Sequence, residues 1–469
     1  MPKKKTALTI EERLQQALVP AEEQPYEVPE NWVWVRLGAV CGFERGITFP
    51  SSAKQNERDD ENIPCLRTAN VQDELELNDL IYVNKKYYKN NIDKLIREND
   101  IIMSTANSRE LVGKTSFVYK VEYPMIFGGF VMALRANKLL SKFLFYYLRL
   151  EFLLGRFRGE STQTTNIANI SSSVLGEYTF PLPPLSEQQR IVERIEELFA
   201  KLDEAKERLQ EVADSFAVRK AAILHKAFTG ELTKQWRREN GVSDESWEER
   251  KLNEICIARA GYAFNSKEFG SKGYQIIRMG NLYGGQLLLD RSPVFIDEEI
   301  LDEKIIEKSI IQKGDILITL TGTKYKRDYG YAVLVTITGK MLLNQRILSL
   351  RPKNDNADFI CYCLQTKEFR DVFFSNETGG VNQGNVSSKF VENISIKYPT
   401  IPEQHEIVRL IDDLLARERS AQQAAEQALA SIDLMKKSIL ARAFRGELGT
   451  NKASEASALE LLRQVLAEN

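Results

Sequence analysis

Residues 186–232 read SEQQRIVERIEELFAKLDEAKERLQEVADSFAVRKAAILHKAFTGEL, and residues 402–448 read PEQHEIVRLIDDLLARERSAQQAAEQALASIDLMKKSILARAFRGEL. The two stretches align without a gap at an offset of 216 residues. Each has a Glu-Gln pair near its start, an Ile-Val pair soon after, and the closing motif Ala-Phe-x-Gly-Glu-Leu. Matches spread over so long a window indicate a duplicated sequence. The chain is therefore expected to contain two copies of one structural plan.

The repeat also extends upstream of these stretches, at an offset of 215 residues. It predicts a tandem order of variable domain, helix, variable domain and helix. The matched residues are Trp32, Leu37, Cys41, Gly46 and Phe49 in the first copy, and Trp247, Leu252, Cys256, Gly261 and Phe264 in the second.

Apolar residues in both quoted stretches recur at alternating steps of four and three, which is the heptad pattern of a coiled coil. Arg219 and Glu418 are the exceptions to the pattern, and Gly230 and Gly446 stand where a left-handed residue would end each helix. The predicted seam consists of Ile191, Ile195, Leu198, Leu202, Leu209 and Phe216 in the first helix, and of Ile407, Ile411, Leu414, Ile432 and Ile439 in the second.

The two helices can pack on their own domains or on each other, and the second alternative is favoured. Each helix of roughly 40 residues would be about 60 Å long. The second variable domain connects the end of one helix to the start of the other, so a parallel pair would force that domain to bridge the whole length. We therefore predict an antiparallel pair with one variable domain at each end. Both chain termini should then lie near the first domain, where Thr9–Leu18 and Ser457–Leu466 could form either solvated or docked helices.

The two variable domains mix strand-like and helix-like runs without regular alternation, so a doubly wound sheet is disfavoured and an α+β class is predicted. Short helices are expected at Ser141–Leu150 and Ala357–Thr366. The predicted strands are Trp32–Leu37, Ile101–Met103, Thr115–Tyr119 and Phe130–Arg135 in the first domain, and Gln275–Met279, Ile316–Leu320, Tyr331–Val335 and Arg346–Arg351 in the second.

Composition excludes several function classes. The 469 residues include 64 Lys plus Arg and 66 Asp plus Glu, for a net charge of −2, so any nucleic-acid contact must come from local basic patches. Two histidines disfavour a His-rich metal site and His general-base catalysis. Five cysteines without a CxxC pair indicate a reducing compartment, and no apolar run reaches the length of a membrane span. We therefore expect a cytoplasmic protein without a membrane segment.

No catalytic motif is complete. Residues 112–115 end like a phosphate-binding loop, but Ser108 stands where its first glycine is required. No GxGxxG opens a helix after a strand, and the run by which amino-methyltransferases hold a flipped base is absent. Glu249 and Lys251 form a nuclease-like ExK without a paired aspartate, which fits a solvated turn.

Polar side chains of the types that read base edges gather near predicted strand ends, where a solvated surface is the alternative for any one of them. Arg67 and Asn70 recur as Arg278 and Asn281, so these shared residues are expected to shape a loop or hold phosphate, while residues that differ are better candidates for base reading. The full candidate DNA-binding set is Arg67, Asn70, Arg109, Lys114, Thr162, Gln163, Asn166, Arg278, Asn281, Lys324, Tyr325, Lys326, Arg327, Arg346, Asn382 and Gln383.

The helix-opening motifs PLPPLSEQQRIV (181–192) and IPEQHEIV (401–408), with the closing motifs AFTGEL (227–232) and AFRGEL (443–448), resemble those of Type I restriction–modification specificity subunits. The resemblance implies two target recognition domains separated by two long helices in a pseudo-two-fold, antiparallel coiled coil that acts as a ruler for the spacer of a bipartite, asymmetric DNA site. The implied segments are 1–25 (N-terminal helix), 26–180 (target recognition domain 1), 181–235 (central helix), 236–400 (target recognition domain 2), 401–450 (distal helix) and 451–469 (C-terminal tail).

The resemblance also implies partners and a non-catalytic role. Two methyltransferase subunits would dock on the helices and carry S-adenosylmethionine, and restriction subunits would bring ATP, Mg and translocation. This chain itself would bind double-stranded DNA and no cofactor or metal. The competing hypotheses are a coiled-coil scaffold that binds only proteins and a stand-alone methyltransferase or nuclease.

Overall fold

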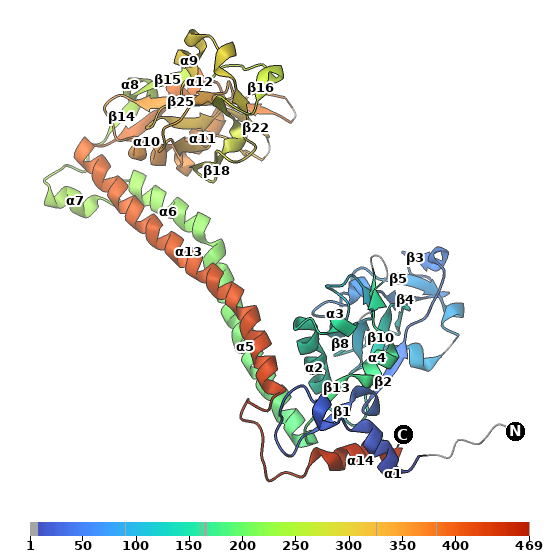
Figure 1. Cartoon of the computed structure of the whole chain (residues 1–469). Helices are drawn as coiled ribbons and strands as arrows, with labels where there is room; N and C mark the ends of the chain where they lie inside the picture. The colour runs from blue at the N-terminus through green and yellow to red at the C-terminus, as the bar shows by residue number, and fades with distance from the viewer. Residues whose placement is uncertain are drawn as a thin grey trace. The chain divides into compact units, whose positions relative to one another are not determined.

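A computed structural model describes residues 8–89, 91–160, 162–163, 167–324, 326–380 and 382–468 of the chain (Figure 1). The chain divides into two compact units. Unit 1 comprises Met1–Arg208 and Ala428–Asn469, and unit 2 comprises Leu209–Gln427.

Unit 1 contains two four-stranded sheets. One is antiparallel with the order β2-β10-β6-β8, and the other has the order β3-β5-β4-β9 with its last pair parallel. Two smaller sheets, β1-β13 and β11-β12-β7, complete the unit. The strands are β1 (Val33–Arg36), β2 (Cys41–Arg45), β3 (Lys54–Gln55), β4 (Asn62–Leu66), β5 (Ile81–Asn84), β6 (Ile101–Ser104), β7 (Ala106–Asn107), β8 (Thr115–Phe117), β9 (Ile126–Phe127), β10 (Val131–Ala136), β11 (Thr162–Gln163), β12 (Ala168–Asn169) and β13 (Thr179–Leu182).

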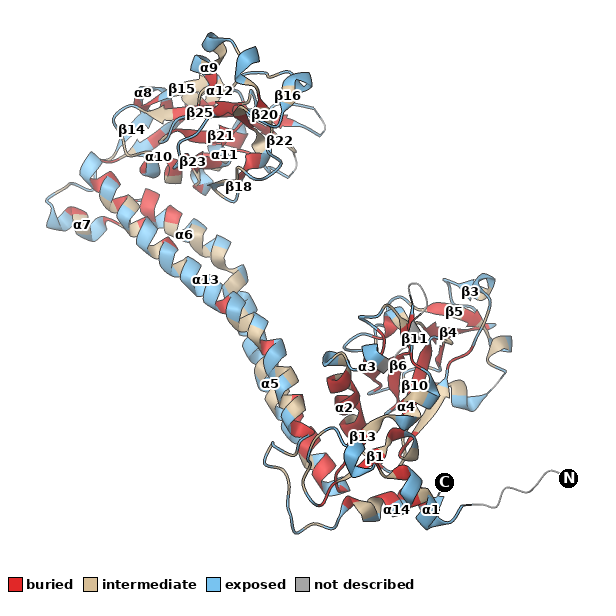
Figure 2. Ribbon diagram, in the orientation of Figure 1, coloured by how far each residue is buried: buried red, intermediate tan, exposed pale blue. Residues whose placement is uncertain are grey.

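Unit 2 repeats this plan. Its sheets β15-β25-β21-β23 and β16-β20-β17-β24 correspond to the two large sheets of unit 1, and β14-β27 corresponds to β1-β13. The central strands of both units are buried (Figure 2). The strands are β14 (Glu248–Lys251), β15 (Cys256–Ala260), β16 (Phe269–Gly270), β17 (Tyr274–Ile277), β18 (Leu282–Tyr283), β19 (Gln286–Leu287), β20 (Phe295–Ile296), β21 (Ile316–Thr319), β22 (Thr321–Gly322), β23 (Ala332–Leu334), β24 (Met341–Leu343), β25 (Ile347–Pro352), β26 (Gly384–Asn385) and β27 (Ser395–Tyr398).

Every strand that periodicity predicted is present, within one or two residues at its ends. The predicted short helices are also present, as α2 (Ser141–Leu153) and α10 (Ala357–Leu364). The chain therefore has the predicted α+β class, with helices and sheets mixed in both units.

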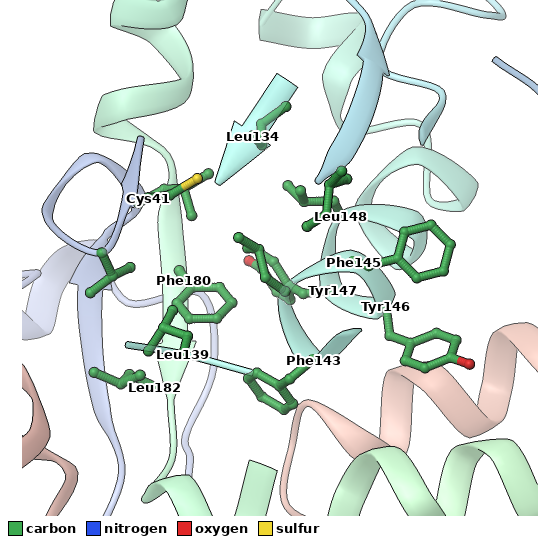
Figure 3. Packing of buried hydrophobic residues seen from close by; sticks show 14 of the residues in the cluster. Cys41, Leu134, Leu139, Phe143, Phe145, Tyr146, Tyr147, Leu148, Phe180 and Leu182 are labelled. Carbon is green, nitrogen blue, oxygen red and sulfur yellow. The ribbon is translucent and has the colours of Figure 1, made fainter. Parts of the chain in front are cut away.

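Aromatic side chains of α2 form the centre of the unit 1 core (Figure 3). The rings of Phe143 and Tyr147 lie 5.0 Å and 5.1 Å from the ring of Phe444, and Tyr147 lies 5.2 Å from Phe180. Phe444 belongs to the second Ala-Phe motif, so the end of the second long helix is anchored in the core of the first domain. In unit 2, Phe228 of the first Ala-Phe motif lies 5.2 Å from Phe359. Each closing motif is therefore a hydrophobic anchor.

The long helices are α5 (Leu185–Asp214), α6 (Phe216–Phe228) and α13 (Ile401–Ala443). We predicted one continuous helix up to Phe228, and this was wrong at Ser215, which separates α5 from α6. Arg219 explains the interruption, because its guanidinium donates to the carbonyl of Val212 at 3.0 Å and to the hydroxyl of Ser215. Gly230 and Gly446 follow the two helix ends with φ of 79° and 72°, as expected for left-handed terminators.

The helices are antiparallel within each unit. In unit 1, Arg190 binds Glu455 at 2.7 Å, and Asp203, further along α5, pairs with Lys436, earlier in α13. In unit 2, Arg219 of α6 pairs with Glu418, and Thr233, just beyond α6, donates to Glu403 at 2.7 Å. The pairing runs in opposite chain directions in both cases, which confirms the predicted orientation.

The starts of the long helices are buried in their own domains, so the alternative of domain packing is also realised there. Ile191 and Ile195 belong to the core of unit 1, and Ile407 and Ile411 belong to the core of unit 2. Of the other predicted seam residues, Ile432 is buried, and Leu198, Leu202, Leu209, Phe216, Leu414 and Ile439 are half-buried.

The repeated Glu-Gln pair joins each helix start to a neighbouring segment. Glu187 is fully buried and accepts hydrogen bonds from Trp32 Nε1 and Asn451 Nδ2, both at 2.8 Å. Glu403 is also fully buried and accepts from Thr233 Oγ1 and Arg237 Nη1, both at 2.7 Å. Each copy of the Glu-Gln pair thus marks a buried polar contact between a long helix and a neighbouring segment.

The N- and C-terminal segments dock together in unit 1. α1 (Ile10–Ala17) packs against α14 (Ala458–Glu468), and Arg13 Nη1 donates to the carbonyl of Leu466 at 2.9 Å (Figure 1). Leu14 and Leu462 lie in the unit 1 core. Of the two alternatives, the structure selects docked helices, and both segments lie with the first domain as predicted. Among the described helices, none is long and apolar enough to cross a membrane.

Arg219 and Glu418, the two exceptions to the heptad pattern, bind each other. Their side chains are 32% and 26% exposed, so the pair is partly desolvated. In a double-mutant cycle of Arg219→Ala and Glu418→Ala we expect a coupling of about 1 kcal/mol in the free energy of unfolding. The exposed pair Asp413–Arg417, which lies on α13 like Glu418, is the control, with an expected coupling below about 0.5 kcal/mol. Equal couplings for both pairs would contradict a special role of the seam pair.

The five cysteines are free and buried. Burial raises the pKa of each thiol from 9.0 to about 12. Since the thiolate is the nucleophile, its population at pH 8 should fall about a thousandfold on folding. We expect iodoacetamide to leave the native chain unlabelled at pH 8 and to label all five cysteines in urea, as mass spectrometry would measure. Rapid labelling of the native chain would contradict this burial.

Candidate nucleic-acid interface

Unit 2 carries a concave basic surface, which we call the unit 2 cleft. It consists of two adjoining hollows of about 620 Å³ and 530 Å³. They share Met279, Gly280, Arg291 and Arg346. The remaining polar lining includes Arg278, Tyr283, Thr323, Asp328, Asn344, Gln345 and Gln383.

The charge of the cleft is predominantly positive. Arg278 donates to the carbonyl of Ser292 at 2.8 Å, and Arg291 lies over the Tyr283 ring at 4.6 Å. Within the described part of the chain, neither these two arginines nor Arg346 forms an ion pair. Three guanidinium groups without an ion-pair partner suit a polyanion.

One carboxylate does line the cleft, that of Asp328. It accepts hydrogen bonds from the Thr323 backbone N–H at 2.7 Å and from the Thr323 hydroxyl at 3.0 Å. The backbone hydrogen bond lowers the pKa of Asp328 most, so the group is held as an anion. Asp328 therefore acts first as an anchor of the Thr323 loop.

An asparagine at the equivalent position of each unit, Asn281 in unit 2 and Asn70 in unit 1, shapes a loop. The Asn281 Oδ1 accepts from the Arg278 backbone N–H at 2.9 Å, and its Nδ2 donates to the carbonyls of Leu288 and Arg291. Asn70 makes the same bonds in unit 1, with the Arg67 backbone N–H and the carbonyls of Glu76 and Asp79.

Asn70 and Asn281 are each 1% exposed, so their side chains do not fit the DNA-contacting role in which we included them. The reason is that their amides are fully used in closing the loop. The alternative expectation, that the shared residues set the loop, agrees with these hydrogen bonds. We leave both asparagines out of the proposed interface.

The loops closed by Asn70 and Asn281 carry different side chains at one equivalent backbone position. Asp79 in unit 1 and Arg291 in unit 2 both offer their carbonyl to the loop asparagine. The Asp79 carboxylate binds Arg67 at 2.7 Å and neutralises it, whereas Arg291 adds a second positive charge beside Arg278. Arg291 was missed by sequence reasoning, because the two loops differ in length and do not align there.

The other predicted residues of unit 1 are scattered more widely. Arg109 is exposed, and Lys114 donates to Gln72 Oε1 at 2.5 Å. Thr162 and Gln163 lie in β11, whose backbone pairs with β12. Asn166 falls outside the described residues.

Most of the other predicted residues of unit 2 are not part of the lining of the cleft. Gln383 lines it and Asn382 is exposed next to it, while Lys324 reaches the carbonyl of Gly379 at 3.5 Å. Lys326 is exposed, and Arg327 lies over the Phe374 ring at 5.0 Å. Tyr325 falls outside the described residues. The fold thus brings Arg278, Arg346 and Gln383 together from three distant parts of the sequence.

The interface has the composition of a binding surface. Among the described residues, no group of three His, Cys, Asp or Glu side chains is placed to hold a metal ion. Arginine, glutamine and asparagine at the rim of a concave surface are the residue types that pair with base edges and phosphates.

Comparison with known proteins agrees with the duplicated plan. The family model for the Type I restriction modification DNA specificity domain matches residues 29–214 and 244–428. The two matches together cover more than half of the chain, one in each repeat.

Relatives of known role resemble the chain over nearly its whole length. It is 27% identical over 471 aligned positions to the Type I restriction enzyme EcoKI specificity subunit of Escherichia coli K12, covering 94% of this chain and 96% of the relative. It is 24% identical to the StySPI specificity subunit of Salmonella potsdam, with the same coverage of both proteins.

Solved structures share the fold. The HsdS subunit from Thermoanaerobacter tengcongensis has a TM-score of 0.60 at 19% identity, covering 91% of this chain and all of that one. A chain from a study of complex assembly and conformational transition of the Type I restriction–modification system has a TM-score of 0.64 at 20% identity, covering 90% of this chain and all of that one.

Proposed function

This chain belongs to the family of Type I restriction–modification DNA specificity subunits, and from that premise we propose that it reads a bipartite, asymmetric DNA sequence. The family consists of non-catalytic recognition subunits. We assign one half of the sequence to residues 26–180 and the other half to residues 236–400. The assignment keeps the two target recognition domains and the helical segments 1–25, 181–235, 401–450 and 451–469 as separate parts.

The observation that carries the proposal is the unit 2 cleft. It combines Arg278, Arg291 and Arg346 with the amide side chains of Gln345 and Gln383. Arginine pairs with guanine and glutamine with adenine in the major groove. The same scaffold in unit 1 presents different side chains, which is what two unlike half-sites require.

We also propose the partners of the complex. Two methyltransferase subunits would bring S-adenosylmethionine, and restriction subunits would bring ATP and Mg, while this chain would bind none of these cofactors. Exposed apolar side chains on the long helices support protein docking there, with Val218 72% and Leu434 68% exposed. A cytoplasmic location is supported by the five free cysteines.

The test is selection from a random-sequence duplex pool by the chain assembled with its methyltransferase partner. We expect enrichment of two short defined segments separated by a spacer of undefined sequence. A scaffold that binds only proteins would assemble with the partner in size-exclusion chromatography and enrich no sequence. That result would overturn the proposed function.

A further inference from the structure

The loop before β10 in unit 1 and the loop before β25 in unit 2 have the same backbone and different side chains. The Phe130 carbonyl accepts from the Thr105 N–H at 3.0 Å, and the Arg346 carbonyl accepts from the Leu320 N–H at 2.9 Å. One residue later, Val131 N–H donates to the Gly128 carbonyl at 2.8 Å, as Ile347 N–H donates to the Asn344 carbonyl at 3.0 Å. Phe130 and Arg346 therefore occupy equivalent positions.

A glycine just past the end of β2 or β15 packs closely against each loop. A Cβ on Gly46 would lie 2.1 Å from the carbonyl oxygen of Gly128, and a Cβ on Gly261 would lie 2.0 Å from the carbonyl oxygen of Asn344. This close approach explains why the glycine recurs in both repeats. It also means that the backbone presents residue 130 or 346 in a preset position, so only the side chain differs between the units.

The neighbours of these residues differ in the same sense. Strand pairing makes Ala168 equivalent to Gly384, because they face Asn107 and Gly322 in matching antiparallel strand pairs. Ile167 is therefore equivalent to Gln383.

Together with the Asp79 and Arg291 pair, three equivalent positions distinguish the units. Unit 2 presents Arg291, Arg346 and Gln383 around its cleft. Unit 1 presents Asp79, Phe130 and Ile167, of which Phe130 is 62% and Ile167 is 48% exposed.

The two sets suit different bases. A guanidinium can donate two hydrogen bonds to the O6 and N7 atoms of guanine, whereas an apolar side chain gains most from the 5-methyl group of thymine. A phenyl ring held outward on a fixed backbone has apolar area to bury against that methyl group. In unit 1 the Asp79 carboxylate pairs with Arg67 and offsets its charge.

We propose that this equivalent position decides base preference in each half-site, with Arg346 reading a guanine for unit 2 and Phe130 reading a thymine methyl group for unit 1. The inference rests on the proposed function, since it assumes that each unit faces a DNA half-site.

The first experiment is sequence selection by the full complex with Arg346→Ala or Phe130→Ala. Arg346→Ala should lower the preference for guanine about tenfold or more at one position in one half-site. Phe130→Ala should relax one thymine position in the other half-site. Binding to random-sequence duplex at the wild-type level shows that each variant still folds and assembles.

The second experiment replaces that thymine by uracil, which removes only the methyl group. The wild-type complex should lose about fourfold in affinity, and the Phe130→Ala complex should bind both duplexes equally.

Matched controls come from the opposite end of the same sheets. Tyr119 is a 60% exposed aromatic residue beyond the far end of β8, and Lys313 is an exposed cation before β21. Tyr119→Ala and Lys313→Ala should leave the selected sequence unchanged.

The outcomes separate the two claims. A wild-type complex that selects no sequence would end the proposed function. A wild-type complex that selects a sequence, with variants that select it at unchanged preference or that both alter the same half, would overturn the inference alone. So would an equal loss on uracil for the wild type and Phe130→Ala.

Discussion

Exchange of residues 246–400 for the corresponding segment of a relative with another target is expected to replace one half of the recognised sequence and to leave the other half intact. The segment contains both strands of the β14-β27 pair, with Glu248 opposite Tyr398, so it closes its own sheet. It also contains the whole lining of the unit 2 cleft. No residue of unit 1 is changed, and its reading surface should keep its chemistry.

The exchanged segment must still fit the helices on which it packs. Leu224 and Phe228 of α6 and Ile407 and Ile411 of α13 contribute to the unit 2 core. A donor that keeps apolar residues against these four should fold without a new cavity.

Sequence selection or methylation mapping of the exchanged complex would measure the outcome. The reciprocal exchange of residues 30–180 is the matched control and should change only the opposite half. A change in both halves after either exchange would contradict the modular assignment.

Glu403→Ala is expected to destabilise unit 2 by about 3–5 kcal/mol, the largest stability effect that we predict for a single substitution. Glu403 is fully buried, and its partner Arg237 has a side chain that is 7% exposed. Removal of the carboxylate would leave the Arg237 guanidinium with Asp244 at the surface and without its buried anion. The Thr233 hydroxyl would lose an acceptor as well.

Hydrogen exchange of unit 2 peptides during chemical denaturation would measure this loss. Asp371→Ala is the control, because Asp371 pairs with Lys367 at an exposed helical position and should contribute under about 0.5 kcal/mol. The combined substitution Arg237→Met and Glu403→Leu should recover most of the stability, since apolar residues of similar volume can replace a buried ion pair. A loss of less than about 1 kcal/mol in the free energy of unfolding for Glu403→Ala would show that this buried ion pair is dispensable for the stability of unit 2.

Sequence reasoning was accurate where the signal is periodic or repeated. The heptad pattern predicted the helices, and the second variable domain between them predicted their antiparallel orientation. The strands followed from short apolar runs. The prediction of one continuous helix was wrong at Ser215. Arg219 donates to the Val212 carbonyl there, and the only sign of this in the sequence is the break in the heptad pattern at position 219.

The candidate interface was harder to predict than the fold. Asn70 and Asn281 are of a residue type that can contact DNA. Only the structure shows that they are buried and that their amides donate to loop carbonyls. Arg291 was missed because the loops of the two units differ in length and do not align there.

The sequence by itself determined the duplication, the helices with their orientation, the main strands and the family, because periodicity and repeated motifs are written along the chain. Only the tertiary structure decided which polar residues share a surface. Arg278, Arg346 and Gln383 are far apart in sequence, and Phe130 and Arg346 become equivalent only through the hydrogen bonds of their backbones. The physical reason is that sheet pairing brings distant loops together, and loops of unequal length carry no register that a sequence comparison can read.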